Sequence, residues 1–311
     1  MQFDVDGFVL YLLAAVGVYA SVIYFYECAR SPLAILWSVI FPNRKPLSER
    51  YGPWAVITGS SDGIGKQYAI NLASKGMNVF LISRTESKLA ELAEQIRSQY
   101  SVDVQWMAID FSQGVQIFET IRKSISGLTI GILVNNVAVG QDYLLEFERF
   151  CTQDVQQTIS VNVTAAVMMT HMLLPEMKQR RRGLIVNVSS VAGLAPGPYI
   201  TLYAASKAFL DSFTTALSQE LHGSGVESQL VTPLFVRTNI NKRYHAVKFS
   251  TQFFTDVKRF GKHAVFTIGR SDSTTGYWAH GIQISLFRLL PVRVRTAVWY
   301  YVAGLLKNKE V

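Results

Sequence analysis

The amino-acid sequence predicts an α/β protein in which a doubly wound parallel sheet follows an N-terminal membrane helix and precedes a C-terminal helical extension. Three observations predict this class. An uncharged apolar segment lies near the N-terminus, short β-branched runs alternate with helical segments through the middle, and an aromatic-rich helical pattern follows. With 311 residues the chain can build one large domain plus extensions. We expect an anchor and linker at 1–50, a central domain at 51–240, and a lid with C-terminal helices at 241–311.

The N-terminal segment from Gly7 to Tyr26 contains no charged residue. As a helix it reaches about 30 Å, which is roughly the thickness of a bilayer's hydrocarbon. Asp4 and Asp6 precede it and no cleavage site is evident, so a cleaved signal peptide is disfavoured. The basic residues after it predict that the rest of the chain is cytosolic. A second apolar stretch, Leu33 to Phe41, is too short to cross and leaves a hairpin or an interfacial anchor open.

Charge and composition indicate which kinds of partner and metal site to expect. The net charge of +8 and the isoelectric point near 9.4 suit nucleic acid, anionic lipid or a polyphosphate ligand. No long basic run with interleaved aromatics is present, so we expect no nucleic-acid partner. The two cysteines, Cys28 and Cys151, are too few for a disulfide framework, and the five histidines show no metal-ligand spacing, so we expect no metal.

After a proline-bearing linker, Pro42 to Pro53, the alternating pattern predicts a parallel sheet covered on both faces. We expect helices to begin near Gly65, Glu86, Gly114, Thr152 and Leu202. The stretch from Asn239 to Arg270 has weak periodicity and is expected to be a substrate-side lid, and a helical segment follows from Thr274 to Leu290. The six predicted strands are Trp54–Thr58, Val79–Ser83, Val104–Asp110, Ile130–Asn135, Leu184–Ser189 and Glu227–Thr232.

The first strand runs into a glycine loop, Thr58-Gly59-Ser60-Ser61-Asp62-Gly63-Ile64-Gly65, and a helix follows. Glycines let the backbone turn sharply and approach a pyrophosphate, whose charge the helix N-terminus attracts. A tight turn without a ligand is the alternative. The candidate cofactor-binding residues here are Gly59, Ser61, Asp62, Gly63, Ile64 and Gly65.

Arg84 ends the second strand, about 20 residues beyond the glycines, where an NAD enzyme holds the ribose 2′-hydroxyl with a carboxylate. A guanidinium at this point can pair with a 2′-phosphate, which favours NADPH over NADH. A solvated surface charge is the alternative.

Tyr203 and Lys207 lie four residues apart near the start of a predicted helix, hence on one face. A neighbouring ammonium and an oxidised nicotinamide both favour the phenolate, which would lower the tyrosine pKa towards neutrality. In reduction Tyr203 is then the expected general acid, and Ser190, at the end of the fifth strand, can donate a hydrogen bond to the same carbonyl oxygen. A tyrosine and a lysine at this spacing also occur on helices for purely structural reasons.

These motifs together resemble the short-chain dehydrogenase/reductase family, in the branch of the 17β-hydroxysteroid dehydrogenases and very-long-chain 3-oxoacyl-CoA reductases. The resemblance covers about residues 50 to 290 and implies a Rossmann-like fold. Thr58 to Gly65 matches the family's glycine motif, Tyr203 to Lys207 its Y-x-x-x-K motif and Ser190 its catalytic serine. The resemblance also implies that Asp110 contacts the adenine, that Asn162 holds a proton-relay water, and that Lys207 binds the nicotinamide ribose. Asn136 belongs to Asn135-Asn136-Val137-Ala138, which matches the family's N-N-A-G segment.

The sequence departs from the family pattern at two places. The final glycine of the N-N-A-G segment is displaced, and the segment after the sixth strand reads Pro233-Leu234-Phe235-Val236-Arg237-Thr238 in place of a P-G motif. The C-terminal Thr274-Thr275-Gly276-Tyr277-Trp278-Ala279-His280 is most similar to the branch of hydroxysteroid dehydrogenase-like protein 1, which is described as inactive because its catalytic tyrosine is replaced. Here Tyr203 is kept, so that reason for inactivity is absent.

The expected activity is therefore NADPH-dependent reduction of a carbonyl on a lipophilic substrate, a very-long-chain 3-oxoacyl-CoA or a keto-steroid. A catalytically silent membrane scaffold is the alternative, and a homodimer is compatible with either. We expect Gly261 to Thr267 and the region around Tyr244 to line the substrate pocket. The tail Lys307-Asn308-Lys309-Glu310-Val311 has the form of a dilysine retrieval signal, which predicts the endoplasmic reticulum membrane with a cytosolic catalytic domain and leaves mitochondria as the alternative.

Overall fold

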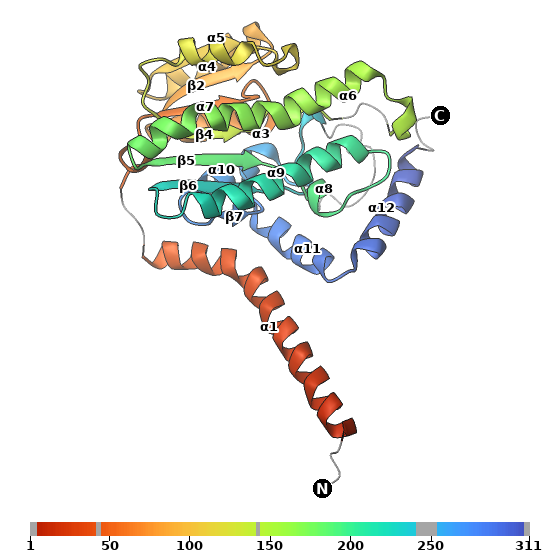
Figure 1. Ribbon diagram of the computed structural model, residues 1–311. Helices are drawn as coiled ribbons and strands as arrows, with labels where there is room; N and C mark the ends of the chain where they lie inside the picture. Colours follow the sequence, from red (N-terminus) through yellow and green to blue (C-terminus); the bar gives the residue numbers. More distant parts are fainter. Residues whose placement is uncertain (1–4, 42–44, 141–143, 241–253, 308–311) are drawn as a thin grey trace. The chain divides into compact units, whose positions relative to one another are not determined.

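The computed structural model describes residues 5–41, 45–140, 144–240 and 254–307, and the chain divides into two units, Met1–Asn43 and Arg44–Val311. The first unit contains helix α1 (Val5–Ile40). Its segment Asp6–Ala29 has a mean hydropathy of 2.1 with no part buried, and is a candidate membrane span. The helix continues through Pro32, so the apolar stretch after it extends the same helix and does not return as the second arm of a hairpin. Proline cannot donate the backbone hydrogen bond of a helix interior, which accounts for the bend in Figure 1.

The second unit is built on a parallel sheet with the strand order β3-β2-β1-β4-β5-β6-β7 over the described residues (Figure 1). The six strands expected from the sequence are present within two residues of their predicted ends. The seventh has only two residues, too few for an alternating pattern to reveal it. The strands are β1 (Trp54–Thr58), β2 (Asn78–Ser83), β3 (Val104–Ala108), β4 (Ile130–Asn135), β5 (Gly183–Val188), β6 (Val226–Val231) and β7 (Ser273–Thr274).

The chain reverses its direction across the sheet at β1. Val56 of β1 pairs with Phe80 of β2 on one side and with Leu133 of β4 on the other. The chain runs outwards from β1 to β3 and then crosses back to β4, so the connections that leave the carboxyl ends of β1 and β4 diverge. In open α/β sheets a ligand crevice forms at such a point.

Helices cover both faces of the sheet because successive side chains of a strand point to opposite faces. Ala55 and Ile57 pack into one core cluster and Trp54 and Val56 into the other. The first cluster is covered by α3 (Gly63–Ala73), α4 (Glu86–Gln99) and α10 (Val257–Phe266). The second is covered by α5 (Ile117–Ser124), α7 (Ala165–Gln179) and α9 (Thr201–Glu220). The shorter helices are α2 (Leu47–Tyr51), η1 (Phe111–Gln113), η2 (Phe147–Arg149), α6 (Thr152–Ile159), η3 (Ser160–Thr164) and α8 (Val191–Leu194).

The short helix α2 is fixed to the sheet by a partly buried cluster around Glu227. The Arg50 guanidinium lies 2.8 Å from the Glu227 carboxylate, and the Tyr51 hydroxyl donates to the other oxygen at 2.8 Å. Tyr51 is 2% exposed, and burial is the first reason that its pKa is raised above the ordinary value. Helix α2 lies within the segment that the sequence predicts as a linker, and it is already part of the second unit.

The C-terminal helices α11 (Trp278–Arg288) and α12 (Val292–Lys307) pack beside α8 and the start of α9 (Figure 1). Arg295 of α12 donates to the carbonyl oxygen of Leu194 at 3.0 Å. The rings of Tyr199 and Tyr300 stack with centroids 6.3 Å apart. The C-terminal extension is thus part of the same structure as the segment that carries the candidate catalytic residues.

The expectation of a lid from Asn239 to Arg270 is wrong for its described second half. Phe260 and Ala264 of α10 are fully buried against α3, and a Cβ at Gly261 would lie 2.3 Å from the Cβ of Gln67. The residues of this segment that pack into the core do have helical spacing: 257, 260, 261, 264, 265 and 268. The charged or polar residues between them, Lys258, Arg259, Lys262 and His263, obscured that spacing in the sequence. Gly261, Ala264 and Val265 therefore belong to the core, Lys262 and Phe266 are exposed, and none of the residues 261–267 lines the cavity. Tyr244 lies outside the described residues.

Candidate active site

A cavity of about 570 Å³ opens at the carboxyl ends of β1, β4, β5 and β6, at the crevice that the strand order predicts. It runs from the glycine loop after β1, past the ends of β4 and β5, to helices α11 and α12. The predicted site residues that line it are Gly59, Ser61, Asp62, Gly63, Ile64, Arg84, Asp110, Asn136, Ser190, Tyr203 and Lys207. Gly65 and Asn162 do not line it and lie directly behind its walls.

The glycine loop forms a cradle at one end of the cavity. Gly59 and Gly63 have φ angles of +64° and +56°, which residues other than glycine rarely adopt. A Cβ at Gly65 would lie 2.3 Å from the carbonyl oxygen of Gly59, so only glycine lets α3 begin this close to β1. Gly65 therefore shapes the cradle from behind. Asp62 caps α3 by accepting a hydrogen bond from the Gly63 N–H at 2.7 Å, and the helix N-terminus faces the cavity.

The loop after β4 is tied to the glycine loop by Thr58 and Asn136. The Thr58 hydroxyl oxygen accepts from the backbone N–H groups of Asn136 at 3.0 Å and Val137 at 3.1 Å. The Asn136 amide donates to the carbonyl oxygens of Thr58 and Gly59 at 3.0 and 3.1 Å. Asn136 thus holds the cradle in place, and the displaced glycine of the N-N-A-G segment does not prevent this clamp.

Arg84 lies where the sequence expects a selector for the ribose substituent. It is exposed, lines the cavity, and makes no hydrogen bond or ion pair with the described part of the chain. The hydroxyl groups of Ser61 and Ser83 are 2.7 Å apart, which ties the glycine loop to the end of β2 next to Arg84. Asp110 caps the short helix η1 by accepting from the Ser112 N–H at 2.9 Å and also lines the cavity. A guanidinium beside a glycine cradle is chemically suited to bind an anion.

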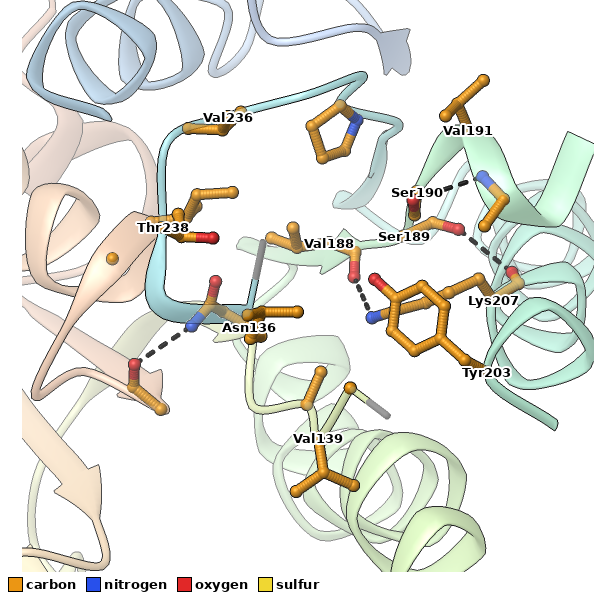
Figure 2. A pocket seen from close by; sticks show the side chains of 18 of the residues that line it. Asn136, Val139, Val188, Ser189, Ser190, Val191, Tyr203, Lys207, Val236 and Thr238 are labelled. Carbon is orange, nitrogen blue, oxygen red and sulfur yellow. Dashed lines mark hydrogen bonds between the residues drawn. The ribbon is translucent and has the colours of Figure 1, made fainter. Parts of the chain in front are cut away.

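Ser190, Tyr203 and Lys207 converge on the cavity from two elements (Figure 2). Ser190 follows β5 and caps α8, where its oxygen accepts from the Ala192 N–H at 3.2 Å. That bond leaves the hydroxyl hydrogen available for an acceptor in the cavity. Lys207 lies one helical turn after Tyr203 on α9, and its Nζ is 5.7 Å from the centroid of the tyrosine ring. The phenol of Tyr203 and the ammonium of Lys207 therefore lie beside the same part of the cavity.

The Lys207 side chain is fixed and almost completely buried. It is 2% exposed, and its Nζ donates to the carbonyl oxygen of Val188 at 3.0 Å (Figure 2). Burial lowers the pKa of Lys207 to about 8, and the negative charge of Asp211 opposes this shift. At neutral pH most of the amine is still protonated, so it can stabilise negative charge on the neighbouring phenol.

Asp211, one turn beyond Lys207, was not anticipated from the sequence. Burial raises the pKa of Asp211 to about 6, although the Ser189 hydroxyl and the charges of Lys207 and Arg288 oppose the shift. Both carboxylate oxygens are inaccessible to solvent, and the nearby Ser189 hydroxyl donates to the Lys207 carbonyl oxygen at 3.0 Å, so the carboxylate forms no well-aligned hydrogen bond within the described residues. A carboxylate without hydrogen bonds is held in its charged form mainly by nearby cations. Asp211 is thus the buried negative charge that faces the positive charge of Lys207. In the sequence it could have been recognised by its spacing, because it follows Lys207 by four residues just as Lys207 follows Tyr203.

Asn162 lies in a π-helical turn, η3, between α6 and α7. Its side-chain oxygen accepts from the Val139 N–H at 2.8 Å, and its amide donates to the Val139 carbonyl at 3.0 Å and to the Ser206 hydroxyl at 3.1 Å. Single π-turns often occur at functional sites. The side chain is 1% exposed and joins the loop after β4 to α9. Its described contacts hold the wall of the cavity behind Tyr203.

His280 is a second residue that the sequence did not identify. It is fully buried, and its Nδ1 accepts from the backbone N–H of Leu234 at 3.3 Å. Leu234 belongs to the segment after β6 that departs from the family's P-G motif, and it lines the cavity. Burial lowers the pKa of His280 to about 4, so the imidazole is neutral and can accept this bond at neutral pH. In the sequence, His280 stands out only as the last residue of the Thr274–His280 motif.

Helices α11 and α12 supply the far wall of the cavity, which sequence reasoning had not assigned to them. Their lining residues are mostly apolar, and Gln283 is the polar exception. Over the described residues no group of three or more metal-ligating side chains is present. The residues of this wall are Gln283, Ile284, Phe287, Val298 and Trp299.

The comparison with protein families identifies the chain. The sequence model of the short chain dehydrogenase family matches residues 53–248, more than half of the chain. The chain belongs to the short-chain dehydrogenase family. The glycine cradle, the Tyr203/Lys207 pair on α9 and the serine after β5 are thus found in a member of that family, on a parallel sheet.

Curated relatives of this short-chain dehydrogenase include proteins with different activity descriptions. The human protein named inactive hydroxysteroid dehydrogenase-like protein 1 is 39% identical over 249 residues, which cover 80% of this chain and 76% of the relative. The rat very-long-chain 3-oxoacyl-CoA reductase is 38% identical over 251 residues, which cover 80% of this chain and 79% of the relative. The comparison therefore shows the family and leaves the activity to be tested.

Solved structures share the fold of this short-chain dehydrogenase. A 7beta-hydroxysteroid dehydrogenase is 25% identical with a TM-score of 0.74, covering 82% of this chain and 99% of that one. A short-chain dehydrogenase from Sphingobium yanoikuyae in complex with NADPH is 29% identical with a TM-score of 0.66, covering 72% and 87%. The Rossmann-like sheet predicted from the sequence is confirmed.

Proposed function

We propose that this short-chain dehydrogenase reduces a carbonyl group on a lipophilic substrate with NADPH, and that Tyr203 is the general acid. The observation that carries the proposal is that Ser190, Tyr203 and Lys207 line the same cavity as the glycine cradle. A proton donor, an oxyanion donor and an anion site in one cavity are what carbonyl reduction by a phosphate-bearing cofactor requires.

The residues of the cradle fit a dinucleotide phosphate. The positive φ angles of Gly59 and Gly63 and the close approach at Gly65 shape a loop that brings the α3 N-terminus to the cavity, and Arg84 is an exposed cation that lines the same cavity. Arg84 would pair with a 2′-phosphate, and Asp110 would lie near the adenine. NADPH supplies a hydride when bound, and this chain's own residues supply the proton and hold the carbonyl.

In the proposed reaction the hydride adds to the carbonyl carbon while the Tyr203 hydroxyl gives its proton to the carbonyl oxygen, which yields an alcohol. Ser190 donates a hydrogen bond to the same oxygen as negative charge develops on it. The Lys207 ammonium stabilises the phenolate that remains and so lowers the cost of proton transfer from Tyr203. Asn162 keeps the wall behind Tyr203 in place.

The substrate is proposed to be lipophilic because α11 and α12 give the cavity an apolar far wall and because the chain carries a candidate membrane span. A very-long-chain 3-oxoacyl-CoA and a keto-steroid both fit this description. We propose the endoplasmic reticulum membrane as the location, with a cytosolic catalytic unit, from the form of the C-terminal tail. Asn162 and Asn187 stand in glycosylation sequons but are 1% and 0% exposed, which suits a cytosolic unit.

We propose the divisions 1–50, 51–240 and 241–311 as functional parts of the chain. Residues 51–240 would hold the cofactor and the catalytic residues, and residues 241–311 would complete the substrate side. Structurally, Arg44–Val311 is one compact unit, since α10 lies in the same core as β1.

The test is NADPH consumption by the full chain with a panel of 3-oxoacyl-CoAs and keto-steroids. Tyr203→Phe is the test variant, and Tyr199→Phe is the matched control, because Tyr199 lies four residues earlier, before the start of α9, and does not line the cavity. We expect turnover of one substrate class, loss of turnover in Tyr203→Phe and retention in Tyr199→Phe.

A catalytically silent scaffold is the second candidate, favoured by the 39% identity to a human protein named inactive. NADPH binding without turnover on any member of the panel would support the scaffold and contradict the reductase.

A further inference from the structure

The C-terminal helices concentrate exposed apolar side chains on one part of the catalytic unit. Over the described residues from 45 onwards, sixteen large hydrophobic side chains are exposed, and ten of them lie between Trp278 and Tyr301. A contiguous exposed apolar surface of this kind marks a site of interaction with a protein, a ligand or a lipid. The other six are scattered over separate elements: Val115, Phe147, Ile159, Phe209, Ile240 and Phe266.

The exposed side chains follow the helical repeat. On α11, Trp278, Ile282 and Leu286 recur at intervals of four residues and are 65%, 56% and 62% exposed. The opposite side of the same helix is used for packing, since Ile284 is 4% exposed and lines the cavity. Helix α11 is thus apolar on two faces. The inner face packs against the protein and lines the cavity, and the outer face is exposed.

Helix α12 repeats this arrangement. Val294, Val298 and Tyr301 are 42%, 46% and 70% exposed at helical spacing, while Ala303 is fully buried. Leu289, at the end of α11, is 61% exposed and continues the outer face between the two helices. We refer to the exposed apolar residues of α11, α12 and the turn between them as the C-terminal apolar surface.

The charge of this region selects one kind of partner. From Ser273 to Lys309 the chain contains no aspartate or glutamate, and Arg288 and Arg293 are exposed beside the apolar residues. A second copy of the chain would place the same cations opposite one another in a symmetric contact. Anionic headgroups complement the arginines, and acyl chains complement the apolar residues.

We propose that the C-terminal apolar surface docks on the interface of a bilayer that contains anionic lipid. This contact is additional to the candidate span in α1, and it would hold the catalytic unit itself against the lipid. Phe287 and Val298 line the cavity from these helices, and Val298 is also 46% exposed. If the proposed function holds, the docked surface is also where a carbonyl dissolved in the bilayer enters the cavity.

The test places an environment-sensitive fluorophore on the full chain in vesicles of phosphatidylcholine and phosphatidylserine. Cys28→Ser and Cys151→Ser remove the native thiols, and Leu286→Cys supplies the labelling site. Val115→Cys is the matched control, because Val115 is an equally exposed apolar residue at 61% that lies outside the C-terminal apolar surface. We expect the label at Leu286 to be quenched several-fold more by a lipid-borne nitroxide, and several-fold less by aqueous iodide, than the label at Val115.

Charge is tested in the same vesicles with Arg293→Glu and the matched control Lys123→Glu, an exposed lysine on α5 that undergoes the same change of charge. Nitroxide quenching at Leu286 should fall with Arg293→Glu and with phosphatidylcholine alone, and should persist with Lys123→Glu.

Two results overturn the proposal. One is ready quenching at Leu286 by iodide, because the surface then faces water. The other is protection from iodide without nitroxide quenching, lost when the protein is diluted among vesicles, because a second copy then covers the surface. Neither measurement needs turnover, so failure of the docking proposal is distinct from failure of the reductase proposal.

Discussion

Replacing Asp211 by asparagine tests the electrostatics that the site requires. Lys207 and Asp211 are four residues apart on α9, so their Cβ atoms are about 5–6 Å apart. Opposite charges at about 6 Å and an effective dielectric constant of about 20 attract by about 3 kcal/mol, or about 2 pKa units. Adjustment of the side chains reduces this effect. We expect Asp211→Asn to lower the pKa of Lys207, which is about 8, by about one to two units.

The direction of the pH effect follows from the charge that catalysis needs. The Lys207 cation is the active form, so activity is present below its pKa and is lost as the pH rises through it. The alkaline limb of the pH profile of kcat/KM for carbonyl reduction should therefore lie near pH 8 in the natural protein and at lower pH in Asp211→Asn. Asp211→Glu, which retains the charge, should keep the limb near its original position.

Asp103→Asn is the matched control, because Asp103 is an exposed aspartate distant in sequence from α9. An alkaline limb that stays in place in Asp211→Asn, or moves to higher pH, would refute the reasoning, because the carboxylate would then not be the charge that keeps Lys207 protonated.

Three further substitutions test other parts of the site. Arg84→Ala should reduce kcat/KM for NADPH about 10- to 100-fold and leave that for NADH nearly unchanged, because one charge-assisted hydrogen bond contributes about 1.5–3 kcal/mol; equal losses with both cofactors would contradict the role of Arg84. Gly65→Ala should abolish NADPH binding, measured by nucleotide fluorescence, because the new Cβ would lie 2.3 Å from the Gly59 carbonyl oxygen. His280→Phe should weaken NADPH binding more than His280→Asn, because only asparagine keeps an acceptor for the Leu234 N–H. The pKa of His280 is lowered by burial to about 4, so the folded state loses about 3 kcal/mol of stability as the pH falls from about 6.5 to about 4, and thermal unfolding of His280→Asn should depend less on pH over that window.

Local patterns in the sequence were sufficient to predict the strands and the loops that line the cavity. A glycine loop, a strand-end arginine and a tyrosine–lysine pair each depend on a few adjacent residues, and the parallel sheet brings the strand ends together. The two-residue strand β7 and helix α10 were missed for different reasons. The first is too short to show a period, and in the second the charged or polar residues Lys258, Arg259, Lys262 and His263 alternate with the buried residues and obscure the helical spacing.

The residues that sequence reasoning missed act through contacts between distant segments. His280 reaches Leu234 across 46 positions, and Arg295 of α12 reaches Leu194 across 101. No local pattern encodes such a pairing, so the C-terminal wall of the cavity became visible only in three dimensions. Asp211 is intermediate, because its spacing from Lys207 is visible in the sequence but its burial is not.

Transfer of deuterium from the nicotinamide C4 position of labelled NADPH to the carbonyl carbon of a 3-oxoacyl-CoA or keto-steroid tests the central claim most directly. The account predicts that the natural protein makes a labelled alcohol and that Tyr203→Phe binds NADPH with similar affinity but forms product at least about 100-fold more slowly. Product formation by Tyr203→Phe at the natural rate, or NADPH binding by the natural protein without transfer to either substrate class, would contradict it.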